Sequence, residues 1–388
     1  MGLQALNYPL SRLLSTVVTM HAPLDTGQPP VVLHVDLDAL AANYRVLRQL
    51  CEGTAVAAVV KADAYGLGMG PIVRALVEAG CEDFFVSSLS EGLLLRHHAP
   101  QGRIFVLAGA TDAPQTCIQA RLVPVLNTAE ELRIWGERGE GLAAAIQIDT
   151  GMTRAGLNLQ EVKSLREHPA LWERLNVVLI MSHLACADTS HALMNDLQRK
   201  EFEDIRRLLP KAPVSLANSA GVLLGRAYHG DLVRPGLALY GADVSDLSHD
   251  LQPVVRLEAR IMQIRDVSHD VSIGYGATAR VKAPARIATL GVGYADGYPR
   301  ALGNKGQVVV AGVRVPVVGR VSMDLVTIDV SAVPIDAVAV GDMVELYGHQ
   351  LALEEVAHWA DTINYEVLTR LSARIPRRYW WHGAAATF

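Results

Sequence analysis

Short apolar segments alternate with amphipathic segments between residues 55 and 239 of this 388-residue chain. The apolar segments are rich in valine, isoleucine, leucine and alanine, which is typical of buried strands, and the intervening segments have helical periodicity. Strands separated by helices usually run parallel, and eight such units favour a closed (β/α)8 barrel. The expected strands are Ala55–Val60, Phe84–Ser87, Ile104–Leu107, Val123–Leu126, Ala143–Ile148, Val177–Met181, Val214–Leu216 and Leu232–Leu239. The expected helices include Met69–Ala79, Thr128–Glu137, Gln160–Glu167, Met194–Leu209 and Gly221–Gly225.

The sequence changes character after Gly241. Valine- and glycine-rich segments there follow one another as strand, turn and strand, and a helical pattern returns only at Ala352–Ala360. Consecutive strands without intervening helices indicate a second, mainly β domain. The predicted fold is therefore α/β, a (β/α)8 barrel followed by a smaller, mainly β C-terminal domain.

These patterns divide the chain into three segments. We interpret residues 1–30 as an N-terminal extension, because no clear fold pattern appears before Val31. Residues 31–245 are interpreted as the barrel and residues 246–388 as the β domain. The first strand, 31–36, is expected to join the β domain although it precedes the barrel.

Composition argues against several classes of protein. The net charge is −5 and lysine and arginine form no long block, so a nucleic-acid-binding surface is not expected. No apolar run reaches the roughly 20 residues needed to span a bilayer, and no membrane association is expected. The four cysteines are scattered, which disfavours a disulfide framework or a metal site and fits a reducing, cytoplasmic location. They are Cys51, Cys81, Cys117 and Cys186.

A lysine stands where the first barrel strand ends. Lys61 follows the apolar run Ala57–Val60 and precedes a glycine-punctuated turn that contains Tyr65. Burying an ammonium group costs several kcal/mol unless the group is paired or deprotonated. Lys61 therefore either extends its amine to water or takes part in chemistry.

Other chemically capable side chains fall at the ends of later strands. The carboxyl ends of the strands carry the active residues of (β/α)8 enzymes, and phosphate often binds after the seventh and eighth strands. Taken singly, His183 fits a buried core histidine, Ser219 a helix N-cap and Arg234 a surface ion pair. Their common position at one end of the barrel favours an active site instead. The set is Lys61, Asp149, Arg154, His183, Asn218, Ser219, Arg234 and Gly236.

Nine motifs between Val31 and Tyr379 are distinctive in combination. They are VVKADAYGLG, IDTGMTRAG, SHLACAD, LANSAG, LVRPGLALYG, IGYGAT, VGYADGYPR, VGRVSMD and INYEV. With them the chain resembles the alanine racemases, a family of fold-type III pyridoxal-phosphate enzymes. The resemblance implies racemisation of L-alanine and D-alanine with pyridoxal 5′-phosphate as cofactor, which supplies D-alanine for peptidoglycan.

The resemblance assigns the cofactor to the barrel. Lys61 is implied to form a Schiff base with the cofactor and to serve as one of two catalytic bases. Arg234 is implied to face the pyridine nitrogen, with His183 beside it, and a guanidinium that stays charged leaves that nitrogen without a proton. The residues implied to hold the cofactor phosphate are Tyr65, Ser219, Gly236, Leu237 and Tyr365.

A second subunit is implied to complete the site. Racemisation requires a base on each face of the α-carbon, and the resemblance gives the second face to Tyr275 of the partner subunit. The backbone amide of Met323, also of the partner subunit, is implied to contact the substrate carboxylate together with Arg154 of the barrel. The expected assembly is a homodimer with shared active sites that bind alanine.

One position departs from the family pattern. Many family members carry, at the position of Gln147, a lysine that becomes carbamylated, which glutamine cannot do. We expect no carbamate, and a neutral amide that offers Arg154 a hydrogen-bond acceptor.

The alternatives to an alanine racemase are a broader-specificity amino-acid racemase, a basic-amino-acid decarboxylase on the same plan, and a non-catalytic carrier of the cofactor. The β domain with Tyr275 disfavours a carrier, which needs no second base.

Overall fold

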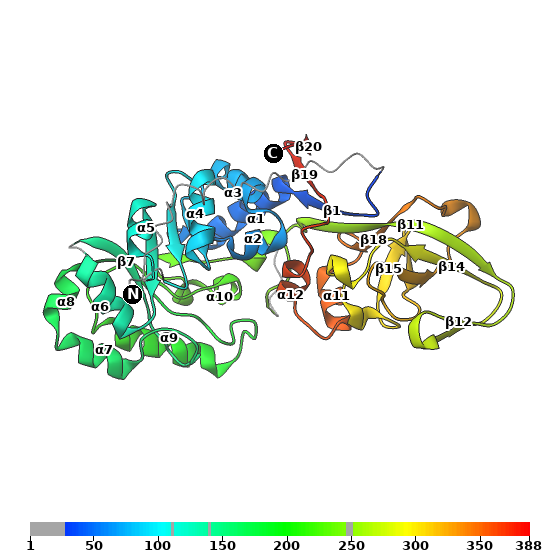
Figure 1. Cartoon of the computed structure of the whole chain (residues 1–388). Coiled ribbons are helices and arrows are strands. Elements are labelled where there is room, and N and C mark those ends of the chain that lie inside the picture. The colour runs from blue at the N-terminus through cyan, green and yellow to red at the C-terminus, as the bar shows by residue number, and fades with distance from the viewer. Residues whose placement is uncertain (1–27, 110–111, 139–140, 246–250) are drawn as a thin grey trace, which may run out of the picture.

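Two bodies, a barrel with its helices and a mainly β domain, lie side by side along an elongated molecule (Figure 1). Residues 1–27 of the expected extension and residues 246–250 at the expected domain boundary lie outside the described residues, so the domain limits stated above stay predictions. The structure is a computed structural model that describes residues 28–109, 112–138, 141–245 and 251–388.

The barrel strands follow one another in the order of the sequence. They are β2 (Ala55–Val56), β3 (Ala58–Val59), β4 (Asp83–Val86), β5 (Arg103–Val106), β6 (Leu122–Leu126), β7 (Leu142–Gln147), β8 (Leu175–Met181), β9 (Val214–Ser215) and β10 (Leu232–Val233). Strands β3 to β9 form a parallel sheet of seven strands. β10 pairs in parallel with β2, and a bridge between Asn218 and Arg234 links the chain after β9 to the chain after β10. The strands therefore close into a ring, which confirms the predicted (β/α)8 barrel.

Helices cover the outside of the barrel (Figure 1). The five expected helices are present, with ends shifted by no more than three residues. None of the helices in the described part of the chain is long and apolar enough to cross a membrane. The α-helices of this body are α1 (Leu37–Leu50), α2 (Lys61–Gly66), α3 (Met69–Glu78), α4 (Leu89–His98), α5 (Pro114–Gln119), α6 (Ala129–Arg138), α7 (Leu159–Arg166), α8 (Pro169–Glu173), α9 (Leu193–Arg206) and α10 (Ser219–Leu223).

The eighth strand is shorter than the predicted Leu232–Leu239. β10 ends at Val233, and Leu237–Tyr240 forms the 3-10 helix η3 instead. Pro235 has no amide hydrogen and so cannot continue the ladder as a donor. The chain turns after Pro235. The apolar residues that had suggested a longer strand form η3 instead, and they are buried there.

The β domain is built on one sheet of nine strands. β1 (Val31–Asp36) lies inside this sheet although it precedes the barrel, since it pairs with β11 (Val255–Val267) and with β19 (Arg377–Trp381). The other elements are β12 (Val271–Ile273), β13 (Ala279–Val281), β14 (Ala285–Leu290), β15 (Gln307–Val310), β16 (Val313–Pro316), β17 (Val326–Asp329), β18 (Met343–Tyr347), β20 (Ala384–Ala386), α11 (Leu353–Trp359) and α12 (Asn364–Thr369). Further 3-10 turns are η2 (Arg226–Tyr228), η4 (Tyr275–Ala277), η5 (Tyr294–Asp296), η6 (Arg300–Leu302) and η7 (Ile335–Ala337).

The two bodies share contacts at the start of α1. The Asp36 carboxylate caps this helix by accepting a hydrogen bond from the Ala39 amide at 2.9 Å. The Asp38 carboxylate accepts hydrogen bonds from the amides of His382 and Gly383, at 3.0 and 2.9 Å, in the last hairpin of the β domain. Buried apolar residues of both bodies also belong to one connected cluster, so the β domain is packed against the barrel rather than tethered to it.

Candidate active site

A cavity of about 670 Å³ opens at the carboxyl ends of the barrel strands. Asp149, Leu237, Tyr275 and Met323 were predicted for the site but do not line this cavity. The predicted residues that do line it are Lys61, Tyr65, Arg154, His183, Asn218, Ser219, Arg234, Gly236 and Tyr365.

Lys61 begins a turn with an unusual backbone. Ala62, Asp63, Ala64 and Tyr65 have φ angles of 54°, 53°, 52° and 59°, so four consecutive residues are left-handed. Each left-handed residue of this kind costs roughly 1–2 kcal/mol. Surrounding contacts must therefore hold the turn in place.

Glu91 of α4 holds the start of the turn. One carboxylate oxygen accepts a hydrogen bond from the Ala62 amide and the other from the Ser87 amide, each at 2.7 Å. This single carboxylate thus joins the chain after β3 to the chain after β4. Further along the turn, the Asp63 carboxylate accepts a hydrogen bond from the Met69 amide at 2.7 Å, at the start of α3.

The β domain holds the end of the same turn. Arg377 on β19 donates from Nη2 to the carbonyl oxygen of Gly66 at 2.9 Å. The hydroxyl group of Tyr379, on the same strand, donates to the carbonyl oxygen of Leu67 at 2.9 Å. Both bodies of the molecule therefore fix the turn that carries Lys61.

The surroundings of Lys61 favour its neutral amine. Burial lowers the pKa of Lys61, the positive charge of Arg154 lowers it further, and the charge of Glu91 acts in the opposite direction. A lower pKa increases the fraction of neutral amine near pH 7. Only the neutral amine can attack a carbonyl carbon or accept a proton.

Arg234 is a buried cation. Its Nη2 atom donates to the carbonyl oxygen of Ser182 at 2.6 Å, its Nη1 atom donates to the Ser215 hydroxyl group, and its guanidinium lies over the Phe85 ring. Burial lowers the pKa of Arg234 to about 9, so the side chain stays protonated at neutral pH. No carboxylate among the described residues pairs with it, and the alternative of a surface ion pair is wrong.

His183 is neutral in this setting. Burial, followed by the charges of Arg234, Arg154 and Lys61, lowers the pKa of His183 to about 3. A neutral imidazole adds no further positive charge beside Arg234 and offers one donor and one acceptor nitrogen.

Ser219, which also lines the cavity, accepts hydrogen bonds from two backbone amides. Its oxygen accepts hydrogen bonds from the amides of Gly236 at 2.8 Å and Ala238 at 3.2 Å. Both acceptor positions are thereby used, so the O–H of Ser219 is left as a donor. The N-cap of α10 is Asn218 rather than Ser219, because the Asn218 side chain accepts from the Gly221 amide at 2.9 Å.

The Tyr65 ring packs against Gly236 and lies close to two further tyrosine rings. A Cβ atom at Gly236 would lie 2.3 Å from the Tyr65 hydroxyl oxygen, so a larger residue there would require the buried Tyr65 side chain to move. The centroid of the Tyr65 ring lies 5.0 Å from that of Tyr240 and 5.9 Å from that of Tyr365. Tyr365 belongs to α12 of the β domain. Its ring thus reaches the barrel residues that were predicted to hold the cofactor phosphate, which we call the phosphate side of the cavity.

The loop that carries Arg154 is braced through its backbone. The Gln147 side chain donates to the carbonyl oxygen of Ala155 at 3.2 Å, and the acceptor that it offers to Arg154 is not used by that side chain. The Asp149 carboxylate accepts from the Thr153 amide at 3.0 Å. The Arg154 guanidinium is therefore exposed at the cavity and bonded to no other described side chain.

Tyr275 and Met323 lie away from the cavity of their own chain. Tyr275 starts η4, between β12 and β13. The preceding strand β12 lies at the end of the β domain that is remote from the barrel (Figure 1). Their side chains are among the exposed large apolar groups, with 72% and 54% of their surface accessible. One chain does not bring them to Lys61.

Sequence reasoning missed three residues that position Lys61. A signal existed for Glu91, because Ser88 and Glu91 have the spacing of a capping box at the start of α4. No local signal existed for Arg377 and Tyr379, which are separated by 311 and 312 residues from the carbonyl groups that they contact.

Comparison with known proteins agrees with this architecture. Residues 35–244 match the family model described as alanine racemase, N-terminal domain, and residues 254–379 match alanine racemase, C-terminal domain. The chain belongs to the alanine racemase family.

Individual relatives align over nearly the full chain. An alanine racemase from Rhodospirillum rubrum is 44% identical over 90% of this chain and 95% of its own length. A catabolic alanine racemase from Agrobacterium fabrum is 42% identical over 89% of this chain and 91% of its own length. The solved alanine racemase from Bartonella henselae, which holds covalently bound pyridoxal phosphate, superposes with a TM-score of 0.87 at 37% identity, covering 91% of this chain and all of that one.

Proposed function

We propose that this cavity interconverts L-alanine and D-alanine, with Lys61 moving the α-proton on one face of the substrate. The isomerase class, alanine as substrate and pyridoxal 5′-phosphate as cofactor follow from membership of the alanine racemase family. The observation that carries the site is Lys61 itself, a lysine with a lowered pKa at a strand end, in one cavity with Arg154 and Arg234.

The donors on the Ser219 side of the cavity fit a phosphate group. Ser219 has an O–H left to donate, Tyr65 and Tyr365 add phenol groups, and η3 begins directly after Gly236. Hydroxyl and amide donors of this kind are the usual partners of phosphate oxygens. We assign the cofactor phosphate to these residues and to the backbone of the following Leu237.

The charge of the cavity fits the same group and an amino-acid carboxylate. The arginines Arg154 and Arg234 line it, and Asp188 is the carboxylate among its described lining residues. The resulting excess of positive charge favours anionic ligands.

Two groups tune the proton transfer on the barrel side. When bound, pyridoxal 5′-phosphate supplies an electron-withdrawing ring that makes the α-proton of the amino acid acidic. We assign Arg234 to the ring nitrogen, where a guanidinium that keeps its proton leaves this nitrogen unprotonated. This limits electron withdrawal to what proton exchange requires and disfavours loss of the carboxylate. Lys61, as a neutral amine, takes and returns the proton on its own face.

The second base comes from a second copy of the chain. Lys61 returns a proton mainly to the face from which it came, so inversion needs another group on the opposite face. We assign that role to the partner's Tyr275, in a homodimer with shared sites. Its exposure at the remote end of the β domain supports this assignment, because an exposed phenol there is available to another subunit.

The substrate carboxylate is assigned to a pair of donors. Arg154 is exposed at the cavity and pairs with no carboxylate of the described residues, and a guanidinium binds carboxylates in a bidentate manner. The backbone amide of the partner's Met323 is the second donor. Gln147, which cannot be carbamylated, supplies no negative charge to Arg154.

The physiological role that we propose is the supply of D-alanine for peptidoglycan in the cytoplasm. The catabolic relative is nearly as similar as the other curated relative, at 42% against 44% identity, so similarity alone does not select the direction. Rescue of a bacterial strain that requires D-alanine tests this role, and failure of an expressed, active protein to rescue would contradict it.

Chiral chromatography tests the activity. Cofactor-loaded protein incubated with L-alanine is expected to yield equal amounts of both enantiomers, and Lys61→Ala protein is expected to yield none. Parallel incubations with L-serine and L-lysine, with measurement of released carbon dioxide, separate a broader racemase and a decarboxylase. Protein that binds the cofactor and leaves all three substrates unchanged contradicts the proposal.

Reduction with borohydride tests the site independently of turnover. Borohydride is expected to fix the cofactor on Lys61, and peptide mass spectrometry then locates the adduct. Attachment to another lysine would overturn the assignment of Lys61 while leaving the family membership unaffected.

A further inference from the structure

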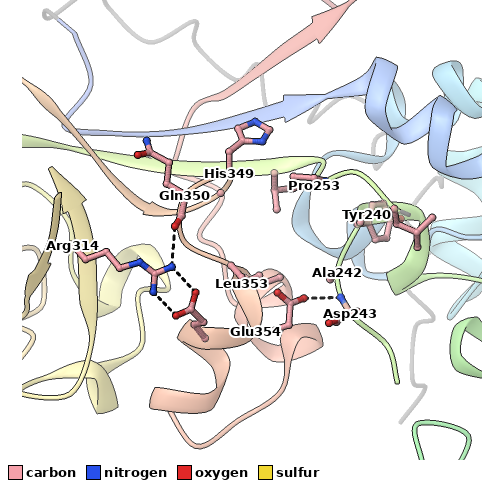
Figure 2. A pocket seen from close by; sticks show the side chains of 15 residues that line it. Tyr240, Ala242, Asp243, Pro253, Arg314, His349, Gln350, Leu353 and Glu354 are labelled. Atoms are coloured by element: carbon pink, nitrogen blue, oxygen red, sulfur yellow. Dashed lines mark hydrogen bonds and ion pairs between the residues drawn. The ribbon is translucent and has the colours of Figure 1, made fainter. Parts of the chain in front are cut away.

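A second cavity, of about 400 Å³, lies where the barrel chain passes to the β domain (Figure 2). On one side, Arg314 forms a forked ion pair with Glu355 at 2.6 and 2.9 Å. On the other side, Glu354 points toward the backbone of Asp243, which follows η3 of the barrel (Figure 2). Two adjacent glutamates of α11 therefore make separate attachments.

The attachment of Glu354 is a closed ring of three hydrogen bonds. Glu354 Oε1 accepts from the Asp243 amide at 2.6 Å and from the side-chain Nδ2 of Asn364 at 3.1 Å. The same Nδ2 atom donates to the carbonyl oxygen of Asp243 at 2.9 Å. Both backbone groups of one barrel residue are thus recognised by two side chains of the β domain.

This ring joins the two halves of the phosphate side. Asn364 is the first residue of α12, and Tyr365 follows it directly. Asp243 follows Gly236 along the chain, just after η3. The Gly236 amide in turn donates to Ser219. The ring therefore fixes where α12 begins relative to the barrel segment that Tyr365 must meet.

We propose that Glu354 and Asn364 are positioning residues that hold the Tyr365 hydroxyl group in register with Ser219 and thereby strengthen binding of the cofactor phosphate. The inference rests on the proposed function, because it takes Tyr365 to be a phosphate ligand. Neither Glu354 nor Asn364 lines the Lys61 cavity, so any effect on the cofactor is transmitted through α12.

Apolar contacts alone do not fix this register. Val367 and Leu368 anchor the later part of α12 in the core, but Ile363 and Tyr365 are exposed to 62% and 37%. The start of the helix thus depends on polar contacts. The Glu354 carboxylate accepts from the N–H of Asp243 and the Asn364 amide donates to the C=O of the same residue. Because hydrogen bonds are directional, the two contacts define the position of this residue more sharply than side-chain packing does.

The test compares dissociation constants of cofactor-free full-length protein for pyridoxal 5′-phosphate and for pyridoxal, which lacks the phosphate. Glu354→Ala removes the shared acceptor, and Asn364→Asp replaces both donors by an acceptor of the same shape. Each is expected to weaken binding of pyridoxal 5′-phosphate roughly 3- to 10-fold and to leave binding of pyridoxal unchanged. Glu354→Gln keeps the acceptor oxygen and is expected to bind like the unmodified protein.

Glu355→Ala is the matched control in the same cavity. It removes the Arg314 ion pair without touching the ring and is expected to leave both dissociation constants unchanged. Equal losses for pyridoxal and its phosphate in Glu354→Ala protein, or equal losses in Glu354→Ala and Glu355→Ala proteins, would show a general structural role and overturn the inference.

Tyr365→Phe separates this inference from the proposed function. If Tyr365 binds the phosphate, Tyr365→Phe alone weakens the binding of pyridoxal 5′-phosphate, and adding Glu354→Ala to it causes no further loss. No loss in the single Tyr365→Phe variant refutes the phosphate role of Tyr365. A loss in Tyr365→Phe with fully additive loss from Glu354→Ala refutes the positioning role alone.

Discussion

Nη2 of Arg234 lies 2.6 Å from the carbonyl oxygen of Ser182, which follows β8. The other terminal nitrogen donates to Ser215 at the end of β9, and Arg234 itself follows β10. One buried guanidinium therefore connects the ends of three neighbouring strands. The bonds offset the cost of burying its charge, so Arg234 is a structural residue of the barrel as well as a residue of the site.

Replacing Arg234 by lysine is expected to destabilise the protein. A lysine ammonium cannot reproduce the planar fork that meets Ser182 and Ser215 together. We expect the free energy of unfolding of cofactor-free protein to fall by about 1–3 kcal/mol, measured by urea denaturation. Arg133→Lys, at an exposed helical position paired with Glu130 and Glu137, serves as the control and is expected to change little. Equal effects of the two substitutions would contradict the structural role.

The low pKa of His183 makes stability depend on pH. The folded protein holds this pKa at about 3, whereas an unfolded histidine titrates near 6.5. The unfolded state therefore binds the proton first, and the stability that neutral His183 permits above pH 6.5 is lost as the pH falls toward 3. At pH 5 this loss amounts to at most about 2 kcal/mol.

His183→Gln is expected to remove that loss. Urea denaturation of cofactor-free protein at pH 7 and pH 5 measures the difference in unfolding free energy, which should shrink in the variant. His168→Gln, at an exposed position before α8, is the control and should leave the difference as it is. If His183→Gln leaves the pH dependence unchanged, the histidine is not neutral in the folded protein.

The barrel and much of the site follow from local sequence patterns. The alternation of apolar and amphipathic segments predicts the strands, and parallel strands bring residues at their carboxyl ends together. Lys61, His183 and Arg234 were located in this way, and they line one cavity. A strand end is a local property, so one sequence is sufficient to find it.

Other features depend on distant parts of the chain. The left-handed turn after Lys61 has no glycine in its four left-handed positions, and contacts from Glu91 and from β19 hold it. The predicted eighth strand was too long because the apolar residues of η3 resemble those of a strand. Leu237 and Gly236 are adjacent, yet only Gly236 lines the cavity. Tertiary packing decides each of these features, and the local sequence pattern does not contain the information needed to predict them.

Tyr275→Phe is expected to affect the two directions of proton removal unequally. If the partner's Tyr275 serves the face of L-alanine and Lys61 the face of D-alanine, the variant loses removal of the α-proton from L-alanine. General acid–base groups contribute about 10²–10⁴-fold, so the difference between enantiomers should be of that order. Single-turnover exchange of α-deuterium with solvent measures it, because equilibrium fixes the ratio of overall turnover.

Tyr228→Phe is the matched control for loss of a phenol. The Tyr228 hydroxyl group donates to the Asp196 carboxylate on the surface of the barrel, at 2.9 Å. Its removal is expected to leave exchange from both enantiomers unchanged. Equal slowing of exchange from L-alanine and D-alanine in Tyr275→Phe protein would argue against a base on one face.

Mixing two inactive variants tests whether the site is shared between subunits. Lys61→Ala protein retains Tyr275, and Tyr275→Phe protein retains Lys61, so a mixed dimer holds one site with both bases and one site with neither. Statistical exchange makes half of all dimers mixed, and half of the sites in each mixed dimer are intact, so about one quarter of the original activity should return. Sites built within single chains gain nothing from mixing.

Subunit exchange is monitored with differently tagged copies, and absence of recovery where mixed dimers are isolated would refute the shared site. Recovery in those same dimers identifies Tyr275 as a residue that one subunit lends to the other, which explains why its own chain leaves it exposed at the remote end of the β domain.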